Sequence, residues 1–320
     1  MEDQKDHTLS LISLIIPVFN EEESLPELFT RVKEALEPSA HEFEILFIDD
    51  GSHDDSFQCM QELSKLDSRV KAVGFQRNYG KATALNAGFQ RCKGDYVITM
   101  DADLQDDPLE VLDLIAVLDT GWDMVSGWKK VRHDPISKRW PSKLYNLTVS
   151  KLSGIAIHDF NCGLKAYKRK VVKNVELYGE MHRYIPVLAK QKGFSCTEKV
   201  VQHHARKYGQ SKYGIKRLFT GYLDLFTVLF LGKYMRKPMH FFGLAGMVLL
   251  LIGAGILTFL SVEWMRQYFF GTGQWISNRP IFYIGILLSI IGGQFISMGL
   301  LGELITSSLH KENPVIRENN

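Results

Sequence analysis

Two carboxylates and one amide follow a short apolar segment in the sequence Asp101-Ala-Asp103-Leu-Gln105. The preceding residues 97–100 are mostly apolar, which predicts a buried strand that ends just before Asp101. In open α/β sheets, ligands bind beyond the carboxyl ends of the strands. Side-chain oxygens of this kind suit a hard divalent cation that also keeps phosphate oxygens as ligands. The alternative is an acidic helix N-terminus, because residues 106–108 (Asp-Asp-Pro) are typical of the start of a helix.

Apolar and amphipathic segments alternate along residues 11–100. Because this order is typical of strand–helix repeats, we expect an α/β fold with a mostly parallel sheet and helices on both faces. The predicted strands lead into polar residues that gather at one edge of the sheet, namely Asn20, Asp50, Arg77 and Asp101. The expected strands are residues 11–19, 43–49, 70–75 and 96–100, and the expected helices are residues 21–36, 52–66 and 80–92. Further along, we expect a helix at 138–152 and extended segments at 163–167 and 194–204.

The overall charge gives no sign of a nucleic-acid partner, because the formal net charge is only +2. Residues 205–240 differ from the rest, since they carry eight Lys or Arg and one acid, Asp224, next to a long apolar run. This basic segment suggests contact with anionic lipid headgroups. No G-x-G-x-x-G motif follows the first strand and no P-loop is present, which argues against a dinucleotide-binding enzyme.

The four cysteines are scattered, and their spacing fits neither a C-x-x-C pair nor a zinc site. We interpret them as reduced core residues of a cytosolic domain. Residues 1–10 are polar, so no signal peptide is expected.

Two long segments carry no charge, residues 238–262 and residues 280–302. At about 1.5 Å per residue, a helix of either length exceeds the roughly 30 Å hydrocarbon core of a bilayer. We therefore expect two transmembrane helices, at 238–262 and 280–304, rather than core helices of a soluble protein. The positive-inside rule places the basic residues before the first span, and the tail 305–320, in the cytoplasm, and the loop 263–279 outside.

Small residues recur every fourth position in the second span, at Gly285, Ser289, Gly293 and Ser297. Such a stripe lets helices approach closely, either within the chain or in a homo-oligomer (a dimer or a tetramer). Before the first span, residues 213–234 have helical apolar spacing. We expect an amphipathic helix at the membrane surface within a juxtamembrane segment, 205–237, with an ordinary domain helix as the alternative. Residues 1–204 would form the cytosolic domain.

Several motifs together resemble one family. Pro17-Val-Phe-Asn-Glu21, Ile48-Asp49-Asp50-Gly51-Ser52 and Asp101-Ala-Asp103-Leu-Gln105 resemble the nucleotide-sugar site of family 2 glycosyltransferases with the Rossmann-like GT-A fold. Asp159-Phe-Asn-Cys-Gly, Gly179-Glu-Met-His182-Arg183 and Arg206-Lys-Tyr-Gly209, followed by two apolar runs, are similar to polyprenyl-phosphate glycosyltransferases. That group includes bactoprenol glucosyltransferases and dolichol-phosphate mannose synthases. The resemblance covers about residues 11–305.

The resemblance implies roles for individual residues. Pro17, Phe19 and Glu21 would line the nucleoside pocket, and Asp49 or Asp50 would hydrogen-bond the base. Asp101, Asp103 and Gln105 would hold Mg²⁺ or Mn²⁺ on the diphosphate, with Ala102 in the same donor site. Independently of the resemblance, Arg77 and Lys81 follow the third strand and could add positive charge near the diphosphate, although a solvated loop is an equal alternative for Lys81.

A polyprenyl phosphate acceptor brings its own nucleophile, because a phosphate monoester is mostly dianionic at neutral pH. The protein must then supply a cationic cradle rather than a strong base. At Lys129 the family usually has arginine, and lysine keeps the charge but loses the bidentate fork. The candidates for this cradle are Lys129, Arg132, Lys138, Arg139, Ser142, Arg206, Ser211 and Lys212, and the alternative for them is a solvated basic surface.

By resemblance, Asp159 is the catalytic carboxylate, and its residue type allows a positioning and electrostatic role as well as a proton-accepting one. An ordinary turn acid is the alternative. His182 and Arg183 are candidates for contact with the sugar or the acceptor.

The expected activity is an inverting, metal-dependent transfer of a hexose, with glucose from UDP-glucose as the first choice, to undecaprenyl phosphate. It would occur at the cytoplasmic face of the plasma (inner) membrane and give a lipid-linked sugar for surface glycan or lipid modification. GDP-mannose and UDP-aminosugars are alternative donors. A processive polysaccharide synthase is a weaker alternative, because the chain lacks a Q-x-x-R-W motif and two spans do not readily enclose a polymer. A further alternative is a membrane adaptor that keeps the fold but has lost the chemistry. The chain still has the acidic residues of the expected site, Asp101, Asp103 and Asp159, which argues against it.

Overall fold

The computed structural model describes residues 10–130, 136–177, 179–205, 207–208, 221, 223–230, 237–270 and 275–309, without the side chains of 136–142, 144 and 309. Several expectations therefore lie outside the described residues, including those for Arg132, Arg206, Ser211 and Lys212 and for the side chains of Lys138, Arg139 and Ser142. The chain divides into two compact units, Met1–Val228 and Leu229–Asn320. Each is described by itself.

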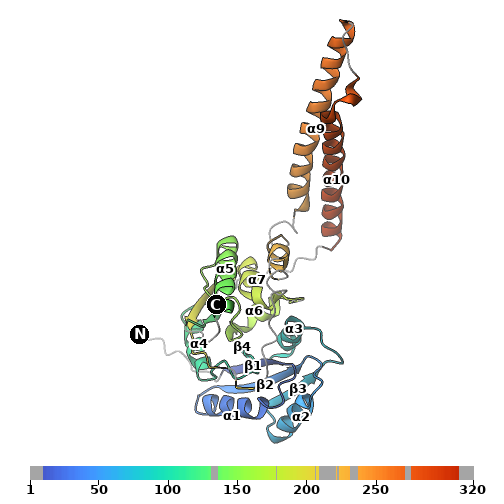
Figure 1. Cartoon of the computed structure of the whole chain (residues 1–320). Coiled ribbons are helices and arrows are strands. Elements are labelled where there is room, and N and C mark those ends of the chain that lie inside the picture. Colours follow the sequence, from blue (N-terminus) through green and yellow to red (C-terminus); the bar gives the residue numbers. More distant parts are fainter. Residues whose placement is uncertain are drawn as a thin grey trace, which may run out of the picture. The chain divides into compact units, whose positions relative to one another are not determined.

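The first unit is built on a seven-stranded sheet with the order β3-β2-β1-β4-β6-β5-β7 (Figure 1). All neighbouring strands pair in parallel except β6, which is antiparallel to both β4 and β5. The expectation of a mostly parallel sheet is confirmed. The strands are β1 (Leu11–Val18), β2 (Glu42–Asp49), β3 (Val70–Gly74), β4 (Tyr96–Thr99), β5 (Met124–Trp128), β6 (Lys165–Lys168) and β7 (Cys196–Val200).

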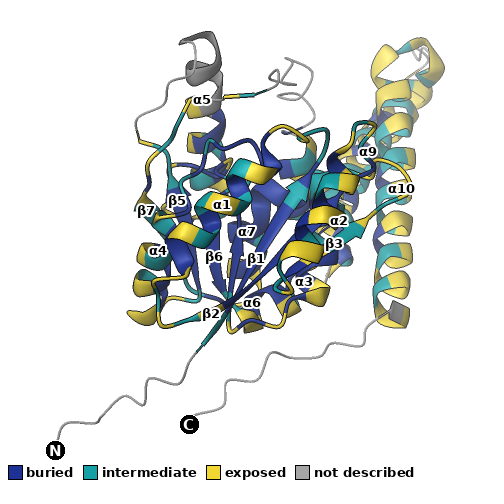
Figure 2. Ribbon diagram, turned by 90° about the horizontal axis from the view of Figure 1, so that it is seen from below, coloured by how far each residue is buried: buried dark blue, intermediate teal, exposed yellow. Residues whose placement is uncertain are grey.

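Helices cover both faces of this sheet, as Figures 1 and 2 show. On one face, Leu14 and Ile16 of β1 share a core with α1 (Leu25–Leu36), α2 (Ser56–Leu66) and α4 (Glu110–Asp119). On the other face, Ile15 packs against Gly88 of α3, where an added Cβ would lie 2.3 Å from the Ile15 side chain. The remaining helices of this unit are α3 (Lys81–Arg91), α5 (Ile136–Ser153), α6 (Arg169–Asn174), η1 (Met181–Tyr184) and α7 (Ile185–Gln191).

The first two helices begin about four residues later than expected, because the residues before them form linked turns. The Asn20 N–H donates to the Ser52 hydroxyl at 2.9 Å, and the His53 N–H donates to the Asn20 side-chain oxygen at 2.8 Å. The Asp55 N–H donates to Glu22 at 2.8 Å. These bonds join the turn after β1 to the turn after β2, so both are held at the same edge of the sheet.

Strand β6 was expected only as a short extended segment with no position in the sheet. It pairs Lys165 with Thr99 and Lys168 with Tyr96, so it begins where β4 ends. The loop that precedes β6 therefore lies at the carboxyl end of β4. This is how Gly163, far along the chain, reaches Asp101.

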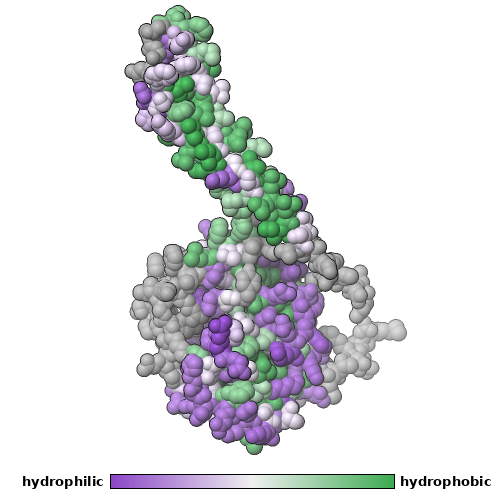
Figure 3. Space-filling model, turned by 90° about the vertical axis from the view of Figure 1, so that its right-hand side faces the viewer, coloured by the Kyte–Doolittle hydropathy of each residue, from purple (hydrophilic) through white to green (hydrophobic). Residues whose placement is uncertain are grey.

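The second unit is a hairpin of α9 (Pro238–Phe269) and α10 (Pro280–Leu309), with a short η2 (Ile276–Asn278) between them. Both long helices have the length and composition needed to span a membrane. Figure 3 shows apolar side chains along much of their visible surface. Helix α9 continues past the expected end at residue 262, and Glu263 accepts hydrogen bonds from Arg266 and Gln267 in these added turns.

The small residues expected to form a stripe on α10 do not all contact α9. Ser289 packs on Gly253 of α9, and Gly285 packs on Leu257. Gly293 has no atom within 4 Å of an added Cβ, apart from its own helix. The first half of the stripe thus serves packing within the chain.

Part of the expected amphipathic helix is described, since residues 223–230 are helical. Leu225 and Val228 are buried, whereas Leu223 and Phe226 are exposed. The Gln191 side chain donates to the Val228 carbonyl at 3.3 Å, which attaches this helix to α7. Its position at a membrane surface stays a prediction.

Candidate active site

The two carboxylates at the carboxyl end of β2, Asp49 and Asp50, are buried and hold the surrounding turns. Asp50 accepts the N–H groups of Tyr79 at 2.7 Å and Gly80 at 2.9 Å, and burial raises its pKa. Asp49 accepts the Ser52 N–H at 3.2 Å. Gly51 has φ +71° and lies against the backbone of Arg77, where a Cβ would come within 2.3 Å. The segment after β3 is therefore held over the end of β2.

The predicted nucleoside-pocket residues lie at this same edge. Pro17 is in β1 and Phe19 directly follows it, with its ring in edge contact with His53 at 6.2 Å between centroids. Glu21 lies in the turn that leads into α1. Arg77 is exposed, and its guanidinium lies over the Tyr79 ring at 4.7 Å. These residues come from the ends of three adjacent strands, and their contact with a nucleotide stays a prediction.

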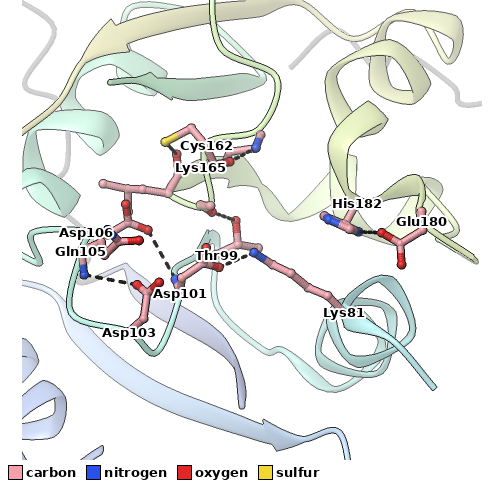
Figure 4. Close-up of polar contacts among 12 residues, drawn as sticks. Lys81, Thr99, Asp101, Asp103, Gln105, Asp106, Cys162, Lys165, Glu180 and His182 are labelled. Atoms are coloured by element: carbon pink, nitrogen blue, oxygen red, sulfur yellow. Dashed lines mark hydrogen bonds and ion pairs between the residues drawn. The ribbon is translucent and has the colours of Figure 1, made fainter. Parts of the chain in front are cut away.

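Asp101 lies at the centre of the charged groups at the end of β4. Lys81, the first residue of α3, extends its amine to the Asp101 carboxylate (Figure 4). Burial would raise the pKa of Asp101, but the Lys81 and Lys129 ammonium groups outweigh it and lower the pKa to about 2. Gly163 packs directly on the same carboxylate, since an added Cβ would lie 2.5 Å from it. Asp101 is therefore ionised and closely confined.

The residues after Asp101 form a tight turn. Ala102 and Asp103 are buried, Leu104 has φ +59°, and the Gln105 N–H donates to Asp103 at 3.2 Å. The Gln105 carbonyl accepts the His204 N–H at 2.9 Å, so a distant segment holds the turn from outside.

This set of oxygen donors fits a magnesium or manganese ion. Asp101, Asp103 and Gln105 offer two carboxylates and one amide oxygen at one turn, which are ligands that hard cations prefer. Among the described residues, no group of three or more His, Cys, Asp or Glu could enclose a metal. A partial shell of this kind suits an ion that takes its remaining ligands from phosphate and water.

Lys129 makes a buried ion pair with a residue that the sequence reasoning had not assigned to the site. Its amine lies 2.7 Å from the Asp106 carboxylate, and the two side chains are 11% and 0% exposed. Although burial opposes it, Asp106 raises the pKa of the Lys129 ammonium above its ordinary value. The other oxygen of Asp106 accepts the Asp101 N–H at 3.4 Å. Lys129 is thus joined to the Asp101 turn, and its predicted contact with an acceptor phosphate stays a prediction.

Asp159 lies in the loop that leads into β6 and is 1% exposed. Its carboxylate accepts the Asn161 N–H at 3.1 Å. The loop is fixed from the sheet, because the Thr99 hydroxyl donates to the Gly163 carbonyl at 2.9 Å and the Lys165 amine donates to the Cys162 and Phe160 carbonyls. The same loop places Gly163 on the Asp101 carboxylate, and the buried Lys165 ammonium interacts electrostatically with both Asp159 and Asp101.

A small pocket lies between this loop, α3 and η1, and its polar lining comes from Lys81, Thr99, Asn161, Lys165 and His182 (Figure 4). Burial lowers the pKa of the His182 imidazole well below its usual range, so the ring is neutral at pH 7. It can contact a substrate but adds no charge there. Sequence reasoning gave no role to three of these residues, Thr99, Asn161 and Lys165, and the available signal for Lys165 was a lysine between the apolar residues Leu164 and Ala166.

The sequence pattern described as "Glycosyl transferase family 2" matches residues 13–176. An undecaprenyl-phosphate 4-deoxy-4-formamido-L-arabinose transferase of Pseudomonas fluorescens (strain Pf-5) is 39% identical over 302 residues, which cover 94% of this chain and 86% of that protein. The chain belongs to glycosyl transferase family 2. The family resemblance noted in the motifs is confirmed, and the protein is a glycosyltransferase.

A second relative is a dodecaprenyl-phosphate galacturonate synthase of Rhizobium johnstonii, 35% identical over 307 residues, or 94% of this chain and 89% of that protein. Among solved structures, glucosyl-3-phosphoglycerate synthase of Mycobacterium tuberculosis with bound UDP matches with a TM-score of 0.51 and 18% identity. The match covers 70% of this chain and 80% of that one. It supports the GT-A fold of the first unit.

Proposed function

We propose that this glycosyltransferase moves one sugar from a nucleotide sugar to a polyprenyl phosphate at a membrane surface. The observation that carries the proposal is the turn of Asp101 and Asp103 at the end of β4, with the loop of Asp159 packed on it through Gly163, in a chain whose relatives match it almost from end to end. The two apolar helices support a membrane acceptor.

For the donor, we replace the expected glucose by a sugar that carries a nitrogen substituent or a carboxylate. The relatives carry the names of a 4-deoxy-4-formamido-L-arabinose transferase and a galacturonate synthase, and neither name concerns glucose. We propose a formamido- or amino-substituted sugar or a uronic acid. UDP is the nucleotide we propose with it.

The reaction needs a leaving group that can carry negative charge. We propose that Asp101, Asp103 and Gln105 hold Mg²⁺ or Mn²⁺, which when bound would neutralise charge on the departing nucleoside diphosphate. Lys81, whose amine already lies on Asp101, adds a cation at the same place. The acceptor phosphate oxygen forms a bond to the anomeric carbon as the bond from that carbon to the diphosphate oxygen breaks, and attack from the opposite side inverts the configuration.

The attacking phosphate oxygen carries no proton at neutral pH. Asp159 therefore need not accept one, and we propose that it orients the sugar and stabilises positive charge that develops at the anomeric centre. The catalytic unit would lie on the cytoplasmic side of the inner membrane, in agreement with the basic residues that precede α9.

A donor screen tests the proposal. Purified protein in detergent receives undecaprenyl phosphate, Mn²⁺ and one donor per reaction: UDP-galacturonate, UDP-4-formamido-arabinose, UDP-N-acetylglucosamine, UDP-glucose or GDP-mannose. The mass of the lipid product reports the sugar, and Asp101→Asn serves as the inactive control. We expect one sugar per lipid from a formamido, amino or uronic acid donor.

If UDP-glucose were the only donor to give a lipid product, the proposed sugar would be wrong, but the polyprenyl-phosphate glycosyltransferase activity would stand. A long polymer would identify a processive synthase instead. If folded protein bound the nucleotide but gave no lipid product with any donor, the polyprenyl phosphate acceptor would be wrong.

A further inference from the structure

The Lys165 ammonium is buried without a counter-ion. The residue is 3% exposed, and in the part of the chain that the structure describes its amine makes no ion pair. It donates to two backbone carbonyls, those of Phe160 at 3.4 Å and of Cys162 (Figure 4). Buried lysines are almost always paired with an anion, because taking an isolated ammonium out of water is costly. A buried charge of this kind is typical of a functional site.

The nearest carboxylates do not act as this counter-ion. Asp101 and Asp159 attract the Lys165 ammonium only at longer range, and Asp101 is already paired with Lys81. Burial lowers the pKa of Lys165, and the Lys81 ammonium lowers it further. A lysine has three N–H donors, so one remains beyond the two carbonyls. The ammonium can therefore accept an anion as a new partner.

This ammonium lines the small pocket between α3, η1 and the loop that leads into β6. The other polar residues in the described lining are Lys81, Thr99, Asn161 and His182, and none of them is acidic. The His182 ring is neutral because burial lowers its pKa. The lining thus carries two cations and no anion, which suits a negatively charged ligand group.

The pocket lies beside the position expected for the donor sugar. Lys81 and Gly163 line it, and both also lie against the Asp101 carboxylate. Asn161, another lining residue, donates its N–H to Asp159 at 3.1 Å. Because the sugar is bonded directly to the diphosphate, a donor whose diphosphate lies at Asp101 carries its sugar toward this pocket.

We propose that Lys165 binds a carboxylate on the donor sugar, so that the sugar moved by this glycosyltransferase is a uronic acid. The inference rests on the proposed function and narrows its donor. A carboxylate would accept the remaining N–H of Lys165 and supply its counter-ion in one charge-assisted hydrogen bond. A formamido group is neutral, and the ammonium of an amino sugar would be repelled.

Donor binding without a lipid acceptor tests this inference separately from sugar transfer. Isothermal titration calorimetry of the full chain in detergent, with Mn²⁺, compares UDP, UDP-galactose, UDP-galacturonate and UDP-4-formamido-arabinose. Galacturonate differs from galactose only in carrying a carboxylate in place of the hydroxymethyl group. We expect UDP-galacturonate to bind about 10- to 150-fold more tightly than UDP-galactose, as for one hydrogen bond between charged groups. UDP-4-formamido-arabinose should show no such gain.

Lys165→Met removes the ammonium and keeps an unbranched side chain. It should remove the preference for galacturonate over galactose and leave the binding of UDP unchanged. Lys192→Met is the matched control, because it removes an exposed charge after α7, outside the pocket lining. This control should keep the full preference. The comparison of donors on the unmodified protein decides the inference even if Lys165→Met does not fold.

Equal binding of UDP-galacturonate and UDP-galactose by the unmodified protein, or tighter binding of the formamido donor, would overturn the inference. A Lys165→Met protein that binds UDP itself more weakly and keeps the galacturonate preference would also overturn it, because the anion at Lys165 would then be the diphosphate. If the preference is present but no donor gives a lipid product, the proposed acceptor is wrong and the uronic acid specificity stands.

Discussion

The Lys129 amine lies 2.7 Å from the Asp106 carboxylate, and neither side chain has appreciable contact with solvent. Lys129 follows β5, whereas Asp106 belongs to the turn after β4. Because Asp106 also accepts the Asp101 N–H at 3.4 Å, one ion pair connects the end of β5 to the proposed metal ligands. The Lys129–Asp106 pair therefore connects the proposed donor site to Lys129, which the sequence analysis considered for the acceptor phosphate.

Lys129→Met should destabilise the protein and weaken donor binding. Removing one partner of a buried pair leaves an uncompensated charge, which costs about 3–5 kcal/mol. The freed Asp106 would also disturb the Asp101 turn. Thermal unfolding in detergent and binding of UDP in the presence of Mn²⁺ measure the two effects.

The neighbouring Lys130→Met is the matched control, because the Lys130 side chain is exposed and its amine lies over the Trp128 ring at 5.7 Å from the centroid. It should leave both measurements unchanged. A Lys129→Met protein with normal stability and normal UDP binding, but a raised KM for the lipid, would assign Lys129 to the acceptor instead.

Gly163→Ala should impair catalysis while the protein stays folded. The new Cβ would lie 2.5 Å from the Asp101 carboxylate, and the Gly163 backbone cannot withdraw easily because Thr99 holds its carbonyl. A shift of the Asp101 carboxylate by about 1 Å would lower kcat/KM on the order of a hundredfold. Steady-state kinetics measure it. Gly255→Ala, where an added Cβ meets no atom within 4 Å, should retain full activity; similar rates for the two variants would contradict the crowding of Asp101.

Removal of divalent metal should abolish transfer reversibly. EDTA should stop the reaction, and Mn²⁺ or Mg²⁺ in excess should restore it, because the diphosphate needs charge neutralisation as it leaves. Asp103→Asn should raise the Mn²⁺ concentration needed for UDP binding. Undiminished turnover after exhaustive chelation would rule out a metal role for Asp101, Asp103 and Gln105.

Asp67 should contribute to stability at neutral pH and lose that contribution in acid. The Arg69 guanidinium donates to it at 2.9 and 2.7 Å and, with Lys33, holds the pKa of Asp67 well below its usual range. In the unfolded protein the pKa of an aspartate is about 3.9. Because the pKa of Asp67 is lower in the folded protein, the ion pair stabilises the fold above that pH, and this stabilisation is lost as the pH falls from there through the folded-state pKa.

The pair is partly exposed, so Asp67→Asn should lower stability by about 1 kcal/mol at pH 7. This corresponds to a fall in Tm of about 2–4 °C. The difference between the two proteins should shrink below about pH 4. A constant difference in Tm between pH 7 and pH 3 would show that the ion pair is not its cause.

Local sequence pattern was sufficient for the alternating strands and helices, for the carboxylates after β4 and for the two apolar helices. Each of these depends on neighbours only a few residues apart, through periodicity, strand-end position or the absence of charge. The polar groups after β1, β2 and β4 could be placed at one edge for the same reason, because parallel strands end on the same side.

Only the tertiary structure decided the position of β6, and with it the packing of Gly163, from the loop of Asp159, on Asp101. It also decided that Lys129 pairs with Asp106, that Lys165 fixes the loop before β6, and which faces of α10 meet α9 or remain open. Apart from the short-range Lys165 contacts, these relationships join residues more than 20 positions apart in the first unit, or depend on which side of a uniformly apolar helix finds a partner. Local periodicity contains neither kind of information, because both follow from how the whole chain closes its sheet and pairs its helices.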